Sequence, residues 1–212
     1  MIRKFKHNLM RISREKKYCQ LISMTNISAG EQILDVGVAD PEYSPYDNYF
    51  EKTYPWPEYI TALSVEPLKE FSNRYPKVRA VEFDGSVFPF QDKSFRLAIS
   101  NAVIEHVGSF NNQVRFVNEM CRVGEKIYLT TPAREFPLEI HTNLPLIHWF
   151  PGNVSDQIYT FAGKGWASGN YMHLLTRKKL ERLLRESKVE SFNIYTHYLG
   201  PFPLHYTVIG TS

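Results

Sequence analysis

Short apolar segments recur along the chain, and each one stops at a turn or at a polar residue. Five of them lie in the first two thirds of the chain, at residues 33–36, 60–65, 78–83, 95–100 and 126–131. Two more follow near the end, at 191–197 and 205–209. Short apolar runs rich in β-branched residues are typical of buried strands. We therefore expect seven strands, the last two forming an antiparallel hairpin through the region 199–201.

Apolar residues with helical spacing lie between or after these strands. Residues 111–123 carry one such stripe, formed by Val114, Val117, Met120 and Cys121. Residues 177–187 carry another, formed by Leu180, Leu183 and Leu184 behind the candidate N-cap Thr176. Alternation of strands and helices predicts an α/β fold, a mostly parallel sheet with helices on both faces.

Two long stretches interrupt the alternation. Residues 38–59 and residues 132–173 each contain four prolines and seven aromatic residues. Long loops inside a compact domain are usually functional or disordered, and the high aromatic content argues against disorder. We interpret 132–173 as an insertion that covers a substrate.

The composition is that of a globular protein, with 43% hydrophobic and 22% charged residues. A length of 212 residues predicts a single domain over 1–212. The two cysteines lack metal-ligand spacing, so we expect neither a disulfide framework nor a bound metal. No apolar run approaches the roughly 20 residues of a membrane span, and no secretion signal is evident, which predicts a cytoplasmic protein.

The basic charge is concentrated in an N-terminal arm, residues 1–30, which we expect to be helical. Residues 1–17 hold seven basic residues and one acidic residue, whereas the whole chain has a net charge of only +3. An amphipathic helix here would make weak peripheral contact with anionic lipid or with an acidic substrate. The alternative is a solvated helix that packs over a ligand cleft. Nothing in this arm clearly indicates nucleic acid.

Residues suited to a nucleoside follow the predicted strands. In open α/β sheets, ligands bind outside the carboxyl ends of the strands. A glycine there permits close approach of the backbone, and carboxylates accept hydrogen bonds from ribose hydroxyls or an adenine amino group. These strand-end residues are Asp35, Gly37, Glu66, Asp84, Gly85 and Asn101.

The order of these segments resembles the class I S-adenosylmethionine-dependent methyltransferases, and most closely the small methyltransferase 11 type. The resemblance rests on ILDVG at 33–37, VE at 65–66, DGSVFPF at 84–90, DKSF at 92–95 and SNAVIEHV at 100–107. It covers residues 31–131 and implies a Rossmann-like, seven-stranded sheet. It also implies S-adenosylmethionine as the cofactor and S-adenosylhomocysteine as the product.

The resemblance assigns roles to the strand-end residues. It implies that Asp35, Gly37 and Asn101 line the methionine end of the cofactor. Glu66 would bind the ribose hydroxyls, and Asp84 with the Gly85 backbone would hold the adenine. The chain departs from the family's usual Gly-x-Gly after the first strand, because Ala39 replaces the second glycine.

Several further residues are candidates for the chemistry. His106 and His141 are possible general bases, since a histidine titrates near neutral pH; a structural role is the alternative for each. We expect the substrate to contact five aromatic or histidine side chains, with simple packing as the competing interpretation. These are Trp56, His148, Trp149, Tyr171 and His173.

The sequence thus predicts a methyltransferase acting on a small-molecule or glycan- or lipid-linked acceptor, at oxygen. Two alternatives stay open. A nucleotide-dependent oxidoreductase also uses an acid after its second strand, although the GxGxxG motif is missing. A degenerate methyltransferase fold could instead act as a non-catalytic binding or assembly subunit.

Overall fold

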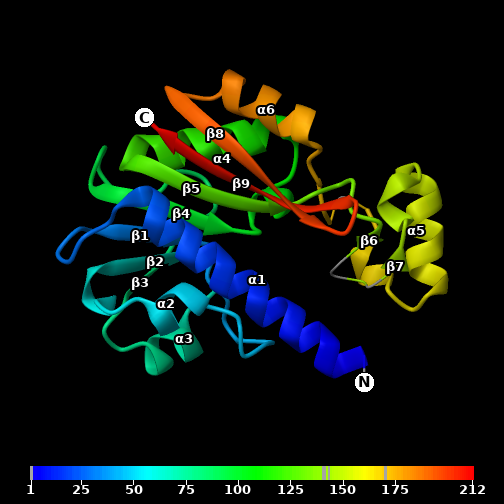
Figure 1. Cartoon of the computed structure of the whole chain (residues 1–212), viewed down its shortest axis with the longest axis horizontal. Helices are drawn as coiled ribbons and strands as arrows, with labels where there is room; N and C mark the ends of the chain where they lie inside the picture. Colours follow the sequence, from blue (N-terminus) through cyan, green and yellow to red (C-terminus); the bar gives the residue numbers. More distant parts are fainter. Residues whose placement is uncertain (1, 140–141, 143, 170) are drawn as a thin grey trace. The chain divides into compact units, whose positions relative to one another are not determined.

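The computed structural model describes residues 2–139, 142, 144–169 and 171–212. Seven strands form one sheet in the order β3-β2-β1-β4-β5-β9-β8 (Figure 1). Their bounds are β1 Ile33–Val36, β2 Ile60–Ser64, β3 Arg79–Glu82, β4 Phe95–Asn101, β5 Gly124–Pro132, β8 Ser191–Leu199 and β9 Phe202–Thr211. All seven predicted strands are confirmed, and their ends differ from the prediction by a few residues. The Rossmann-like sheet is mostly parallel with antiparallel strands at its C-terminal end, as predicted.

Six α-helices are described. Their bounds are α1 Ile2–Thr25, α2 Tyr49–Thr53, α3 Lys69–Arg74, α4 Phe110–Val123, α5 Gly152–Phe161 and α6 Arg177–Glu186. The predicted stripe of α6 is buried at all three leucines, and the Thr176 hydroxyl caps the helix by accepting from the Lys179 N–H at 3.2 Å. Helices α2, α3 and α5 were not predicted. None of the helices in the described part of the chain has the length and apolar content of a membrane span.

The chain divides into two compact units. Unit 1 comprises residues 1–99, 119–128 and 211–212, and unit 2 comprises residues 100–118 and 129–210. In unit 1 the three strands β1, β2 and β3 are parallel, with Ile33 opposite Ile60 and Thr61 opposite Arg79. Every residue of β2 is buried, which accounts for its continuous apolar run.

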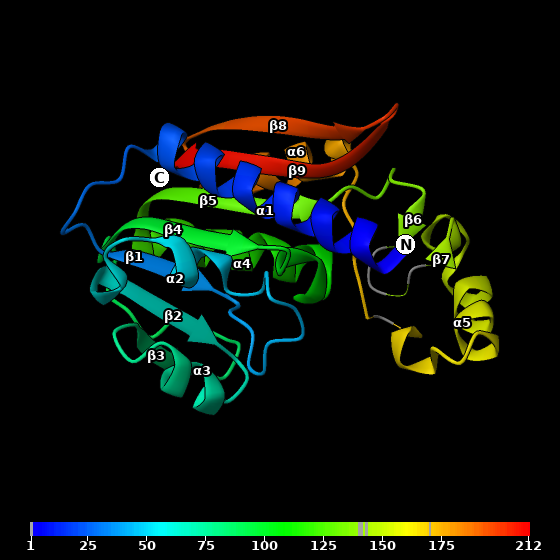
Figure 2. The same ribbon diagram turned by 60° about the horizontal axis from the view of Figure 1, so that its bottom comes forward.

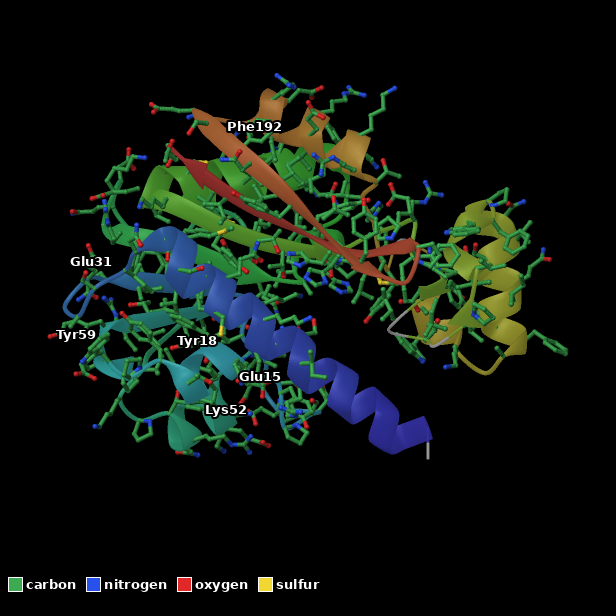
Figure 3. The ribbon with its side chains drawn as sticks, viewed as in Figure 1. Glu15, Tyr18, Glu31, Lys52, Tyr59 and Phe192 are labelled. Carbon is green, nitrogen blue, oxygen red and sulfur yellow. The ribbon has the colours of Figure 1, made fainter. Side chains whose placement is uncertain are left out.

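Aromatic contacts hold helix α2 against helix α1 in unit 1. The ring of Tyr18, labelled in Figure 3, lies 6.1 Å from that of Tyr49 and 6.2 Å from that of Phe50. The Tyr18 hydroxyl donates to the Thr53 carbonyl at 3.4 Å. The basic arm is therefore a helix that packs on the segment following β1, at least over its second half.

Polar contacts order the segment between β1 and α2. The Asn48 side chain makes two hydrogen bonds of 2.9 Å with the backbone of Ala39. Asp40 accepts from the Phe71 N–H at the start of α3, and Glu42 pairs with Lys52 at 2.9 Å. The stretch 38–59 is thus a fixed structural segment, as its aromatic content predicts.

The insertion in unit 2 has its own small core. After β5 the chain forms the antiparallel pair β6 (Leu138–Glu139) and β7 (Leu144–Pro145), then the 3-10 helix η3 (Ile147–Trp149), α5 and the 3-10 helix η4 (Gly165–Ala167). Ile147, Tyr159 and Ala167 are buried against one another. A parallel bridge between Ala133 and Leu175 joins the two ends of this insertion. The long strands β8 and β9 follow it (Figure 2).

Candidate functional site

Three strand-end acids of unit 1 lie on neighbouring strands. Asp35 is the third residue of β1, and Glu66 and Asp84 each come two residues after the ends of β2 and β3. The strands are parallel and in register, so their carboxyl ends share one edge of the sheet. Pairing continues past the strands, because the Gly37 N–H donates to the Leu63 carbonyl at 2.8 Å. Gly37 has a φ of +89°, which favours glycine.

Glu66 presents its carboxylate to solvent. Its backbone N–H donates to the Ser64 hydroxyl at 3.0 Å, which fixes the turn after β2. The side chain is exposed and its carboxylate accepts no hydrogen bond from the described residues. A carboxylate in this state can accept from two hydroxyls of a bound molecule.

Asp84 and Gly85 form a tight turn after β3. The Asp84 carboxylate accepts from the Ser86 N–H at 2.9 Å and from the Ser86 hydroxyl at 2.5 Å. These hydrogen bonds lower the pKa of Asp84, so it is an anion at neutral pH. Gly85 has a φ of +83° and lies beside Val65.

Two exposed valines flank this turn, and the sequence analysis missed them. Val65 is 59% exposed and Val87 is 61% exposed. Val65 directly precedes Glu66, and Val87 comes two positions after Gly85. Their exposure depends on the folded turns, so the local sequence does not indicate it. Exposed apolar side chains beside polar acceptors suit the faces of a flat heteroaromatic ring.

A buried carboxyl pair lies behind the first strand end, and its second member was also missed. Glu51 of α2 is only 5% exposed, and its carboxyl interacts electrostatically with that of Asp35. Burial is the largest cause that raises the pKa of Asp35 well above its usual range, followed by the charge of Glu51. Burial likewise raises the pKa of Glu51. In sequence, Glu51 looks like an ordinary surface residue of a short helix.

The first strand end differs from the family pattern in a second way. Both backbone groups of Ala39, at the place of the second glycine, are bonded to the Asn48 amide. The turn is therefore closed by a side chain of its own loop.

In unit 2, Asn101 ends β4 and bonds to β5. Its side-chain oxygen accepts from the Thr130 hydroxyl at 2.7 Å, which fixes the orientation of the amide. The next residue, Ala102, has a φ of +59°, so the chain turns sharply there into the 3-10 helix η2 (Ile104–His106).

His106 lies at the end of that turn and is exposed. Its ring nitrogen Nδ1 is 3.3 Å from the Tyr171 carbonyl, and the two rings are 5.2 Å apart. The His173 N–H donates to the Glu105 carbonyl at 2.7 Å. The fold thus brings together three of the predicted residues, His106, Tyr171 and His173.

His148 and Trp149 lie on the insertion, at a different place in unit 2. His148 Nε2 and Trp149 Nε1 both contact the Arg134 carbonyl, at 2.8 Å and 3.0 Å. Burial lowers the pKa of His148, so this ring is neutral at pH 7. A cavity of about 410 Å³ is lined by Arg134, Glu135, Trp149 and Thr176.

Trp56 is not joined to these groups. Trp56 precedes β2 in unit 1 and packs on Tyr54 with ring centroids 5.6 Å apart. It therefore lies at the amino end of β2, opposite the end that carries Glu66. His141 lies outside the described residues. Among the described residues, no group of three or more His, Cys, Asp or Glu side chains could hold a metal ion.

The seven-stranded sheet thus carries one acid within β1 and one acid shortly after each of β2 and β3. Residues 34–126 match the model of the family described as "Methyltransferase domain" (Methyltransf_11). No curated protein sequence matches the chain.

Solved structures of methyltransferases are similar in fold. A methyltransferase from Methanosarcina mazei is 17% identical with a TM-score of 0.59, over 90% of this chain and 96% of the other. A possible histamine N-methyltransferase from Thermotoga maritima is 12% identical with a TM-score of 0.56, over 100% and 95%. The CurJ carbon methyltransferase is 12% identical with a TM-score of 0.56, over 93% of this chain and 53% of that one.

Residues 34–126, somewhat less than half of the chain, thus match a methyltransferase family, and the fold is that of S-adenosylmethionine-dependent methyltransferases, whose cofactor is S-adenosylmethionine. The match favours a methyltransferase over a nucleotide-dependent oxidoreductase. At 12–17% sequence identity, the similar structures support the fold alone. Their names refer to nitrogen and carbon methylation, so the fold does not specify the methylated atom.

Proposed function

We propose that this protein transfers the methyl group of S-adenosylmethionine to an oxygen of a small-molecule or glycan- or lipid-linked acceptor, in the cytoplasm. The observation that carries the cofactor part is the alignment of Asp35, Glu66 and Asp84 on three neighbouring parallel strands. This is the edge of an open sheet where ligands bind.

The residues at these strand ends are suited to the ribose, adenine and methionine parts of the cofactor. The exposed carboxylate of Glu66 can accept from both ribose hydroxyls. Val65 and Val87 supply apolar surface for adenine, while Asp84 and the Gly85 backbone can hydrogen-bond its edge. Asp35 and Gly37 would hold the methionine end. The hydrogen bonds between Ala39 and Asn48 involve neither Asp35 nor Gly37, so the altered glycine turn is compatible with binding.

The bound cofactor supplies a methyl group on a sulfonium, ready for in-line displacement. The protein's own task is mainly to align the acceptor with that group, because such a displacement depends on proximity and orientation. As the new oxygen–carbon bond forms and the sulfur–carbon bond breaks, the acceptor hydroxyl loses its proton.

His106 is our candidate for the group that takes this proton. When Nδ1 carries a hydrogen and donates it to the Tyr171 carbonyl, the ring lone pair is on Nε2. The Tyr171 ring packs against the His106 ring, and the His173 N–H donates to the carbonyl of the adjacent Glu105. We therefore assign Tyr171 and His173 to binding of the acceptor. His141 remains a second candidate base.

The insertion would hold the more distant part of the acceptor. Its cavity exposes the face of Trp149, which is 47% exposed, beside the side chains of Arg134 and Glu135. A flat apolar face with charged hydrogen-bonding groups at its rim suits a sugar ring. His148 fixes this wall through its contact with Arg134, and its own role is to position Trp149.

Replacement of Glu66 tests the proposal. Glu66→Gln should weaken S-adenosylmethionine binding by about tenfold or more, because one acceptor of a charge-assisted hydrogen bond is lost. Glu58→Gln is the matched control, since Glu58 is an exposed glutamate at the other end of β2. Calorimetric titration of the two variants checks this. Equal affinity in Glu66→Gln and the unmodified protein would contradict the ribose contact.

A further inference from the structure

The strongest unexplained feature of unit 1 is the buried carboxyl of Glu51. Neither of its oxygens receives an N–H or O–H hydrogen bond from the described residues, although the residue is only 5% exposed. A buried acceptor without a donor is costly, so such groups call for an explanation. After burial, the strongest influence on the pKa of Glu51 is another carboxyl, that of Asp35.

The groups around the pair do not neutralise it fully. Arg14 of α1 is near Asp35 and acts as a weaker influence than burial and Glu51. Glu42 adds negative charge beside Glu51. Lys52, the adjacent cation, turns its ammonium to Glu42 at 2.9 Å and to the Asp47 carbonyl at 2.7 Å. It is labelled in Figure 3 on α2.

Two neighbouring carboxyls, one buried and the other half-buried, cannot both ionise easily, so they share a proton while no cation is bound. Asp35 lies two residues before Gly37, at the strand end assigned above to the methionine part of the cofactor. That part carries two cationic groups, an α-ammonium and a sulfonium.

We infer that Glu51 is a cofactor-binding residue that, together with Asp35, binds a cationic group of the methionine part of S-adenosylmethionine and releases a proton on binding. The inference rests on the proposed function and deepens it. The short motif segments of the sequence analysis contain Asp35 but not Glu51, although the family match over residues 34–126 spans both. Glu51 is supplied by the segment 38–59, which Asn48 and the Tyr18 ring contacts hold in place. The proton of the pair leaves to solvent, and both carboxylates then face the cation.

The test is calorimetric titration with S-adenosylmethionine, S-adenosylhomocysteine and adenosine, in buffers with different ionisation enthalpies and over about pH 5 to 8. The unmodified protein should release protons with the first ligand but not with adenosine, which lacks the methionine part. Its affinity for S-adenosylmethionine should rise with pH until the free pair is ionised.

Glu51→Gln should lower S-adenosylmethionine affinity about tenfold, abolish the proton release and leave adenosine binding unchanged. Unchanged adenosine binding also shows that the variant is folded. An equal loss with S-adenosylhomocysteine would identify the ammonium as the bound cation, whereas a loss confined to S-adenosylmethionine would identify the sulfonium.

Two results would overturn the inference. One is that Glu51→Gln binds S-adenosylmethionine with the affinity and proton release of the unmodified protein, while Glu66→Gln is weakened; the proposed function then stands and only the role of Glu51 fails. The other needs no variant: the unmodified protein binds S-adenosylmethionine with no proton exchange over the whole pH range. If the unmodified protein does not bind the cofactor at all, the proposed function fails as well.

Discussion

At the scale of single residues, the site depends on backbone conformations that few residue types accept. Gly37 and Gly85 both have positive φ values, +89° and +83°, at the strand ends where the cofactor is expected. A side chain at such a position strains the backbone even where space is available. The hydrogen bonds at these turns therefore form at backbone conformations that favour glycine.

Gly85→Ala should destabilise the protein by about 1–2 kcal/mol and weaken S-adenosylmethionine binding, since the Asp84 turn must shift. The nearest atom to the new methyl, Val65 Cγ1, is 3.5 Å away, so the cost arises from φ and not from a clash. Gly152→Ala, a site with open space and an ordinary φ, is the control. Urea unfolding measures both. Equal stability of Gly85→Ala and the unmodified protein would contradict this account.

His148 gives a prediction for pH dependence. Burial lowers its pKa below the ordinary 6.5. A histidine with a depressed pKa resists protonation in the folded state, whereas the unfolded chain takes up the proton at its usual pKa. The free energy of unfolding should therefore fall as the pH drops below about 6.5, and less so in His148→Gln. Histidine NMR titration would contradict this if His148 titrated at or above 6.5.

The residues that sequence analysis missed are those whose role depends on neighbours far along the chain. Val65 and Val87 look like strand or core residues, and only the folded turns leave them more than half exposed. Glu51 looks like a surface residue, and only the packing of α2 buries it. In contrast, Asp35, Glu66 and Asp84 were predictable because each directly follows or ends an apolar strand.

At the scale of elements, a helix or strand could be predicted from the sequence when its apolar pattern repeats over the whole element. The strands and the helices α4 and α6 were predicted because their apolar residues repeat over whole elements. Helices α2 and α3, with five and six residues, are too short to show helical periodicity. They form because of tertiary contacts: the Tyr18 rings for α2, and the Asp40 carboxylate for the start of α3.

The N-cap of α6 offers a simple test at this scale. Thr176→Ala should cost about 1 kcal/mol of stability, because the Lys179 N–H loses its acceptor at the start of the helix. Thr176→Ser keeps the hydroxyl and should cost much less. Thermal unfolding of both variants checks this. A Thr176→Ala protein as stable as Thr176→Ser would show that the cap contributes nothing.

At the scale of the whole molecule, the chain divides into two compact units. Unit 1 carries Asp35, Glu66 and Asp84, and unit 2 carries Asn101, His106 and the insertion. We propose cofactor binding for the first unit and acceptor binding for the second, and variants in each unit test these roles separately. The insertion has a separate core, so its aromatic residues serve partly for its own stability. The sequence could not distinguish packing aromatics from contact aromatics there.

The central claim is that the strand ends of unit 1 bind S-adenosylmethionine. Calorimetric titration of the unmodified protein with S-adenosylmethionine, S-adenosylhomocysteine and NAD tests it most directly. We expect saturable binding of the first two ligands, each with one site, and no binding of NAD. Absence of binding by both S-adenosyl compounds, or preference for NAD, would contradict the account.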